Sequence, residues 1–298
     1  MRFVGLASFS LARLSLLAMG AALSVSSALY AQEKPYFVTY STDLEEPGNL
    51  EVALKGLTAS PKDANAFISP TIELEYGATA WWTTEVYAQG QSTVNDSTVF
   101  TGYRLENRFR PLPREYFVTP VLYVEWESVS NADKSILEIT GHDGIQRFQV
   151  NNGQTRGIVE HSLEGKLILS SNFKGWNVSE NMIAEKNMSN EPWEFGYAVG
   201  AARSLASAGS AHRCFLCRQN FDAGAELYGG LGDRYSFGLK QTSQYAGPTV
   251  DFRTPNGPTL SFSPQFGLND NSIGTLWRFK VSYEVQQIRD LFKSKDSR

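Results

Sequence analysis

The residues suited to acid–base or nucleophilic chemistry are few and scattered. Of the three histidines, His142 precedes Asp143 and His161 precedes Ser162. An imidazole beside a carboxylate can form an acid–base pair, and a serine nucleophile needs a histidine to accept its proton. A histidine in a polar loop is more commonly just solvated. We therefore expect no catalytic residue, with the His142–Asp143 pair as the enzymatic alternative.

The two cysteines, Cys214 and Cys217, form a single Cys-x-x-Cys pair. No histidine follows Cys217, so the pattern of covalent haem attachment is missing. One such pair supplies only two of the four ligands that a structural zinc ion takes. In an oxidising compartment we expect a local disulfide, with a redox-active or metal-touching pair as the alternative. The sequence therefore predicts no metal and no cofactor.

Charged side chains recur at every second position over much of the chain. Arg104, Glu106 and Arg108, for example, alternate with Leu105 and Asn107. If this face encloses a lumen, facing arginines and carboxylates set a transverse field that orients polar solutes and tunes ion preference. The alternative is that the charges pair across a filled lumen and only stabilise the barrel. The residues that we predict to line the lumen are Glu73, Glu75, Glu85, Arg104, Glu106, Arg108, Glu125, Glu160, Glu164, Lys166, Glu194, Asp222, Glu226, Arg278 and Lys280.

The elements that must position these side chains are β-strands. Apolar and polar residues alternate with period two, and helical periodicity is nearly absent. Glu180 interrupts the apolar face of one segment and predicts a bulge there. The predicted strands lie within residues 50–54, 68–76, 82–89, 99–110, 118–127, 158–169, 174–185, 193–201, 221–227, 235–252, 260–268 and 277–285.

The number of strands depends on two segments. Residues 235–252 change phase midway, and residues 128–156 are polar and irregular apart from a short apolar run at 136–139. Splitting the first segment or adding the run at 136–139 gives thirteen or fourteen strands. Single-chain bacterial barrels have even strand numbers. The sequence therefore predicts twelve strands, with fourteen as the alternative, and a long outer loop at residues 128–156.

Residues 1–31 have the pattern of a secretory signal peptide. Arg2 and Arg13 precede an apolar run at residues 14–23, and Ala31 is the expected cleavage site. The run is shorter than the roughly 20 apolar residues that span a bilayer. Its removal leaves 25 basic and 31 acidic residues, a formal net charge of −6, which disfavours a nucleic-acid partner. We divide the remainder into a periplasmic lead-in (32–47), a barrel (48–286) and a charged tail (287–298).

The strand pattern favours a membrane barrel over a soluble secreted β protein, which stays as the alternative. Many segments approach the roughly 9–11 residues that cross a bilayer at a tilt. Tryptophans such as Trp82, Trp126, Trp193 and Trp277 lie at segment ends, where outer-membrane barrels have their aromatic girdles. Only helices and closed barrels satisfy the backbone in lipid. We predict an all-β fold: a closed antiparallel up-and-down transmembrane β-barrel in the Gram-negative outer membrane.

The end of the last predicted strand bears on assembly. Phe279, Tyr283 and Val285 approximate the alternating terminal pattern of outer-membrane strands, which the barrel-assembly machinery reads. Thirteen further residues follow Val285, which departs from the common pattern. We expect outer-membrane lipid as the environment of the chain and the assembly machinery as its partner during biogenesis.

Four stretches carry a resemblance to known proteins. Residues 106–111, 173–177, 193–197 and 226–233 resemble those of predicted outer-membrane barrels of the transporter type, near the phenol-degradation (meta-pathway) barrel group. The resemblance covers most of the mature chain, but its motifs are structural. It implies a barrel fold and passage of small molecules, and it brings no catalytic residues.

Taken together, these features predict a passive channel or uptake protein for small molecules. One alternative is a structural or plugged barrel whose outer loop binds a partner. Another is an outer-membrane enzyme of the lipase or protease type, but the run of residues 161–165 does not match the His-x-Ser-Asn-Gly motif of the outer-membrane phospholipase. The sequence does not identify the solute.

Overall fold

A computed structural model describes residues 33–135, 140–142, 148–207, 215–254 and 257–288. The chain divides into two units at Ala31 and Gln32, and the second unit contains the whole sheet. The expected signal peptide, Asp143 and Cys214 lie outside the described residues. The predictions that depend on them, including the Cys214–Cys217 disulfide, stay predictions.

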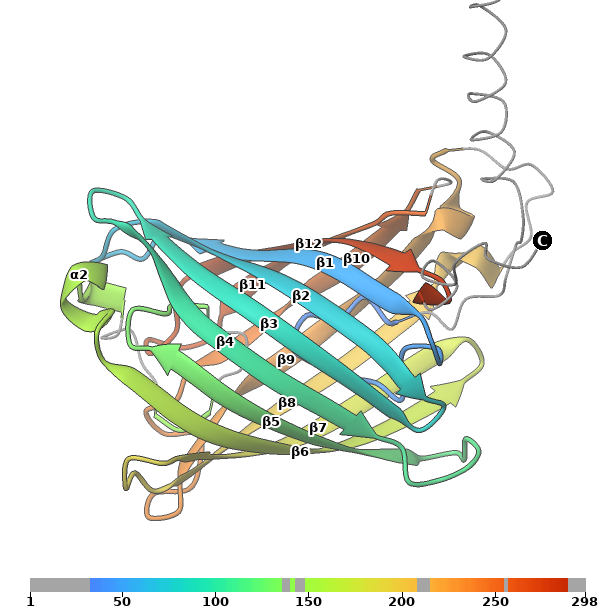
Figure 1. Cartoon of the computed structure of the whole chain (residues 1–298), viewed down its shortest axis with the longest axis horizontal. Helices are drawn as coiled ribbons and strands as arrows, with labels where there is room; N and C mark the ends of the chain where they lie inside the picture. Colours follow the sequence, from blue (N-terminus) through green and yellow to red (C-terminus); the bar gives the residue numbers. More distant parts are fainter. Residues whose placement is uncertain (1–32, 136–139, 143–147, 208–214, 255–256, 289–298) are drawn as a thin grey trace, which may run out of the picture. The chain divides into compact units, whose positions relative to one another are not determined.

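Twelve strands of the described chain form one sheet (Figure 1). Each pairs antiparallel with its neighbours in sequence. Their bounds are β1 (Leu50–Ala59), β2 (Phe67–Thr79), β3 (Trp82–Thr93), β4 (Thr98–Phe109), β5 (Thr119–Ser130), β6 (Val159–Phe173), β7 (Trp176–Asn187), β8 (Trp193–Ser204), β9 (Phe221–Asp233), β10 (Gln244–Arg253), β11 (Thr259–Gly267) and β12 (Thr275–Val285).

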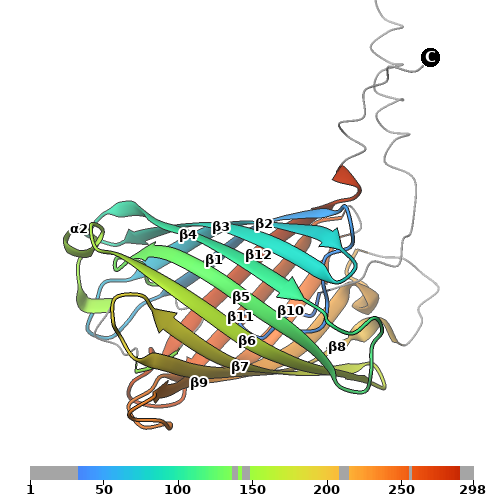
Figure 2. The same cartoon turned by 60° about the horizontal axis from the view of Figure 1, so that its bottom comes forward.

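The first and last strands close the sheet into a barrel. β1 pairs with β12 from Leu50 opposite Val285 to Ala59 opposite Leu276, and Figure 2 shows the strands running obliquely around it. Closure removes the sheet edges, whose unpaired backbone groups lipid cannot satisfy. The predicted all-β, closed antiparallel barrel of twelve strands is confirmed. Residues 235–243 precede β10 and form no additional strand of the barrel. The run at 136–139 lies outside the described residues.

Alternation along each strand separates a polar interior from an apolar exterior. In β2, Ile72 and Leu74 are 54% and 43% exposed, whereas Glu73 and Glu75 are each 1% exposed. The other strands repeat this pattern with exposed residues such as Val281. An apolar outer face on a closed barrel is the arrangement that satisfies a lipid environment. The protein is therefore an outer-membrane β-barrel of a Gram-negative cell.

Two details of the strands differ from expectation. The bulge predicted at Glu180 is wrong, because β7 keeps its register with β6 and β8 and Glu180 simply faces outward between Leu169 and Val199. Register shifts occur instead near Gly77, Gly90 and Gly196, where glycine relieves the local crowding of a bulge.

The long β5–β6 connection, residues 131–158, carries the short helix α2 (Asn152–Thr155) at one end of the barrel (Figure 1). The β8–β9 connection includes two turns of 3₁₀ helix, η2 (Leu205–Ser207) and η3 (Arg218–Asn220). Among the described residues, the helices are too short and too polar to cross a membrane.

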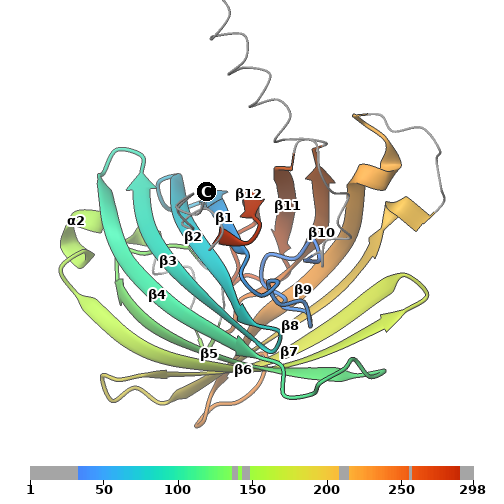
Figure 3. The same cartoon turned by 45° about the vertical axis from the view of Figure 1, so that its right-hand side comes forward.

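Residues 33–48, which we call the luminal segment, lie inside the barrel. Figure 3 shows them in blue within the ring of strands, joined to the start of β1. Val38 is 1% exposed and packs in a cluster with Ala198 of β8 and Tyr228 of β9. The segment contains no strand or helix. The sequence predicts a periplasmic lead-in at residues 32–47 and does not predict this position in the lumen.

Candidate functional site

The residues predicted to line the lumen face the interior of the barrel. All of them are buried except Glu160 and Glu194, which are half-buried. Both of these lie near the barrel end that carries α2, at the start of β6 and of β8. The structure therefore places the charged side chains of that prediction around one space, the lumen. The luminal segment occupies part of the same space.

Small residues on β8 leave room for the luminal segment. Gly196, Ala198, Gly200 and Ala202 are the buried residues at alternate positions of this strand. A Cβ atom built on Gly200 would lie 2.6 Å from a ring carbon of Tyr36, far closer than a carbon–carbon contact allows. This run of small inward residues is the one sequence signal that something other than wall side chains fills the lumen.

The main chain of the luminal segment is held by two wall side chains. The carboxylate of Glu226 on β9 accepts hydrogen bonds from the amides of Phe37, Val38 and Thr39 at 3.0, 2.9 and 2.7 Å. Asn181 on β7 accepts the next amide, that of Tyr40, at 2.6 Å and donates to the Tyr40 carbonyl at 2.9 Å. Hydrogen bonds to a carboxylate are among the strongest in proteins. Four consecutive amides are thus satisfied.

Two tyrosines anchor the side chains of the segment. Tyr36 donates to the Asn177 amide oxygen at 2.9 Å. Tyr40 donates to Glu106 at 2.9 Å and packs edge-on against Tyr123, with ring centroids 5.1 Å apart. The ammonium of Lys166 lies 4.5 Å from the Tyr40 ring centroid, within the range of a cation–π contact.

Arg108 is the centre of an ion-pair network beside the segment. Its guanidinium contacts Glu85, lies 2.5 Å from Glu75 and 3.2 Å from Glu106, and donates to the Asp43 carbonyl at 3.1 Å. The network is buried, so each partner depends on the others for its charge to be tolerated.

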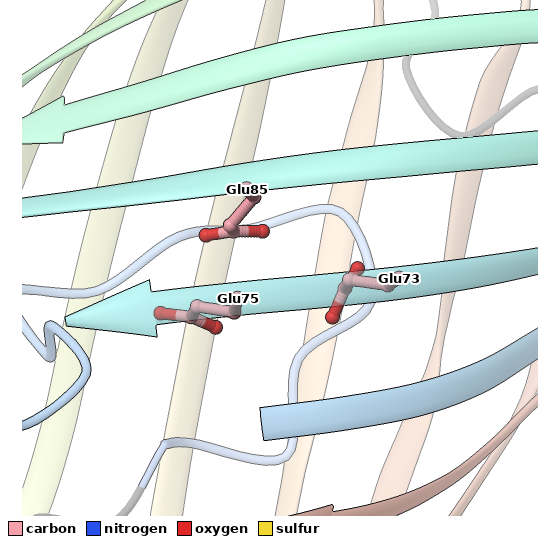
Figure 4. Close-up of side chains that lie close together, drawn as sticks. All are labelled: Glu73, Glu75 and Glu85. Atoms are coloured by element: carbon pink, nitrogen blue, oxygen red, sulfur yellow. The ribbon is translucent and has the colours of Figure 1, made fainter. Parts of the chain in front are cut away.

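Three carboxylates of this network, Glu73, Glu75 and Glu85, come within 4.8 Å of one another (Figure 4). Such a cluster resembles a cation site, but positively charged side chains of the protein already lie against these carboxylates. Lys55 contacts Glu73, and Arg108 contacts the other two. The chemistry of the cluster is therefore that of an internal salt-bridge network.

Acidic groups of the luminal segment respond to this field in opposite ways. Burial raises the pKa of Glu33, but the cations Lys280, Arg108 and Lys55 outweigh it and lower the pKa to about 2. Glu33 lies 3.1 Å from Lys280. Burial and then the neighbouring carboxylates raise the pKa of Glu45 to about 8.

The β5–β6 connection folds into the other end of the barrel. Lys134, Phe148 and Asn152 are buried, and Phe148 stacks on Phe67 with ring centroids 5.6 Å apart. Asn152 donates its side-chain amide to the carbonyl of Ser97 at 2.8 Å. The described part of this connection therefore narrows the opening at the α2 end of the barrel, which the luminal segment does not reach.

Small spaces remain beside the luminal segment. A cavity of about 40 Å³ lies between the segment and the charged wall of β1, β2 and β12, room for roughly three waters at 10–15 Å³ each. A second cavity of about 250 Å³ lies at the barrel end where β6 turns into β7. It is lined by Lys34, Asn177 and Asp222, among others.

The histidines weighed as catalytic residues lie apart. His161 faces outward on β6 and stacks on Trp126 with ring centroids 5.8 Å apart. His142 lies 3.9 Å from the carboxylate of Asp233, and its sequence neighbour Asp143 is outside the described residues. His142 therefore has a carboxylate partner at the end of β9, whereas His161 lies on the outer face of the barrel.

No protein-family model and no curated protein matches the sequence. The fold is similar to solved structures. One is a KdgM porin in complex with disordered oligogalacturonate, at 8% identity and TM-score 0.48, covering 79% of this chain and 98% of that one. Others are LpxR from Salmonella typhimurium (10%, TM-score 0.41, 78% and 99%) and the outer membrane phospholipase A from Escherichia coli (10%, TM-score 0.39, 91% and 97%). A likeness at this level assigns no function.

Proposed function

We propose that this protein is an outer-membrane channel or uptake protein for small molecules, and that the luminal segment closes it in the conformation described here. The observation that carries the proposal is how the lumen is filled. A twelve-stranded barrel lies between small filled barrels and wide aqueous porins. Here a single length of chain without strand or helix occupies part of the lumen and is held there by the wall.

The contacts of the segment suit displacement. The contacts named above are side-chain hydrogen bonds, ion pairs and packing, and the segment adds no strand to the sheet. Each of these polar contacts can be exchanged for water in a polar lumen. Removal of the segment would expose a wall of charged and hydroxyl groups, which suits the passage of polar solutes.

A hinge for the movement lies at the junction with β1. Gly48 has φ +90°, a backbone conformation that favours glycine. The chain beyond this point is fixed: Gly77 donates to the Asn49 carbonyl at 3.1 Å, and Asn49 accepts the amide of Gln287. Gly48 itself is also held, because its amide donates to the Gly77 carbonyl at 2.8 Å and its carbonyl accepts the amide of Ile288 at 2.9 Å. The segment would therefore move on the N-terminal side of Gly48 while the barrel wall keeps its register.

Finer features of this proposal rest on the sequence. Membership of the phenol-degradation barrel group rests on the four stretches at 106–111, 173–177, 193–197 and 226–233. We also propose that the barrel catalyses no reaction and that the barrel-assembly machinery inserts it. The resident environment, outer-membrane lipid, follows from the apolar exterior.

The test is single-channel recording of the refolded mature protein in a planar bilayer. We expect discrete openings from a mostly closed state, because the segment must leave before solute passes. A variant that weakens the segment, Gly200→Ala, should open more often. A folded, heat-modifiable barrel that shows no conductance in either form would contradict the channel and favour a structural, filled barrel.

A further inference from the structure

We infer that the lumen wall around Glu226 and Asn181 is a binding site for the main chain of short peptides, and that the luminal segment occupies it in cis. This inference rests on the proposed function and names a solute class for it. It starts from the hydrogen bonds that the wall makes to the main chain of residues 37–45.

The wall meets a continuous run of peptide groups. The main-chain amides of residues 37–39 all donate to the carboxylate of Glu226. The side chain of Asn181 accepts from the main-chain amide of Tyr40 and donates to its carbonyl. Both wall residues are almost fully buried, at 2% and 0% exposure. A carboxylate that accepts adjacent N–H groups matches a ligand with donors at peptide spacing.

Farther along, the wall again addresses backbone. Arg108 donates to the carbonyl of Asp43 at 3.1 Å, and the hydroxyl of Thr83 accepts the amide of Glu45 at 3.0 Å. Main-chain contacts therefore extend from residue 37 to residue 45 along four wall strands, β3, β4, β7 and β9. Because every peptide has these groups, recognition of this kind gives affinity with little dependence on sequence.

The wall also leaves space for side chains. The small residues Ala198 and Gly200 on β8 line the stretch where residues 36–38 lie. The cavities of about 40 and 250 Å³ flank the same segment. A ligand with side chains other than those of the luminal segment can thus be accommodated at several positions. The site admits a class of compounds, the short peptides.

A free peptide must compete with a tethered one. A segment joined to the wall by a short linker has an effective concentration in the millimolar range. The test therefore uses the full mature chain with Phe37→Pro and Thr39→Pro, which removes two of the three N–H donors to Glu226 from the segment and leaves the wall unchanged. The probe is a fluorescein-labelled synthetic peptide with the sequence of residues 33–46.

We expect saturable binding of the probe to this variant by fluorescence anisotropy. Addition of Glu226→Gln or Asn181→Ala to this variant should weaken its affinity for the probe at least tenfold. The control is Asn187→Ala, which lies on β7 like Asn181 but bonds Glu160. It should leave the affinity unchanged. A probe N-methylated at the positions of residues 37–39 should also bind at least tenfold more weakly. A probe with alanine at the position of Thr39 alone should stay within about threefold, because this change keeps the three amides and the packing of Val38.

Two results would overturn the inference: no saturable binding of the probe, or binding that N-methylation and Glu226→Gln leave unchanged. Conductance of the same Phe37→Pro/Thr39→Pro variant is measured separately, so that failure of this inference can be told apart from failure of the proposed function. Conductance without peptide binding would leave the channel and remove the peptide site. Peptide binding without conductance would leave the site and contradict the channel.

Discussion

The side chain of Asn181 pairs with the main chain of Tyr40 as one β-strand pairs with its neighbour. Its side-chain oxygen accepts the Tyr40 amide at 2.6 Å and its side-chain nitrogen donates to the Tyr40 carbonyl at 2.9 Å. A single side chain thus provides both halves of a main-chain pairing in the lumen. It does so without bringing residues 33–48 into the sheet, so the wall can hold them and still release them.

Loss of this pairing should loosen the luminal segment. Asn181→Ala removes two buried hydrogen bonds, worth about 1–3 kcal/mol together. We expect the open fraction of the channel to rise roughly tenfold in single-channel recordings. Asn187→Ala is the matched control, since Asn187 is an inward residue of the same strand that bonds Glu160. An equal effect of the two substitutions would contradict a specific role for Asn181.

A methyl group at Gly200 should act on the luminal segment from β8, the strand next to that of Asn181. The added carbon would lie 2.6 Å from the Tyr36 ring, and overpacking of this kind costs about 1–3 kcal/mol. We expect Gly200→Ala to raise the open fraction and to speed hydrogen exchange of the amides of residues 36–39. Gly165→Ala is the control, because the nearest atom to its added carbon is 3.9 Å away. Unchanged exchange in Gly200→Ala would show that the ring adjusts without moving the segment.

Arg108 should matter more for stability than an arginine at the surface. Arg108→Met leaves Glu75, Glu85 and Glu106 buried without their shared cation, and breaking a buried ion pair from one side costs about 3–5 kcal/mol. We expect a lower midpoint of urea unfolding in detergent micelles, measured by tryptophan fluorescence. Arg110→Met, which loses only an exposed bond to the Ala80 carbonyl, should change the midpoint little. Equal midpoints for the two variants would exclude the network as a source of stability.

The closed state should weaken as pH rises. The pKa of Glu45 is about 8 when the segment is seated, against 4.5 for a solvated glutamate. The seated state therefore binds this proton more tightly, so its advantage is complete below about pH 4.5 and is lost as pH rises towards 8. Burial also raises the pKa of Asp43, although Lys34 lies 3.3 Å away, and acts in the same direction.

Glu33 makes the opposite contribution in a different pH range. Its pKa of about 2 means that its stabilising effect is present above about pH 4.5 and is lost only as pH falls towards 2. Between pH 5 and 8, Glu45 thus sets the trend, and openings should become more frequent with pH. Glu45→Gln should flatten the dependence, and Glu115→Gln, an exposed turn residue, should not. A dependence that survives Glu45→Gln would assign it to other carboxylates.

The open channel should prefer cations. Among the residues predicted to line the lumen, ten are acidic and five are basic, and a negatively lined passage in a low-dielectric wall attracts cations. We expect a reversal potential of the sign for cation selectivity under a potassium chloride gradient. Glu164→Gln should reduce its size, and Glu115→Gln, outside the lumen, should leave it unchanged. Anion selectivity would contradict the assignment of this face to the permeation path.

The alternation of side chains was enough to predict the barrel, because burial in a barrel wall has the same period as the pleat. Ile72 and Leu74 face out while Glu73 and Glu75 face in, as their spacing indicates. Glu180 gives a false signal, since a charged side chain on an apolar face is typical of a break in register. In the structure it is an outward-facing glutamate within the unbroken register of β7.

The luminal segment could not be predicted in the same way. Residues 33–48 have no periodicity, and their partners lie on strands far along the chain. The small inward residues of β8, from Gly196 to Ala202, were visible in the sequence. They show that space is left in the lumen, but spacing alone does not say which part of the chain fills it.

The reach of these contacts along the chain has a consequence for the order of biogenesis. The residues that leave the ribosome first after the expected signal peptide find their partners 141 residues later at Asn181, 189 later at Glu226 and 247 later at Lys280. Contacts of such sequence separation form late in folding. The segment therefore has no complete place to settle until β12 has arrived, and its seating marks the moment at which a finished barrel becomes sealed.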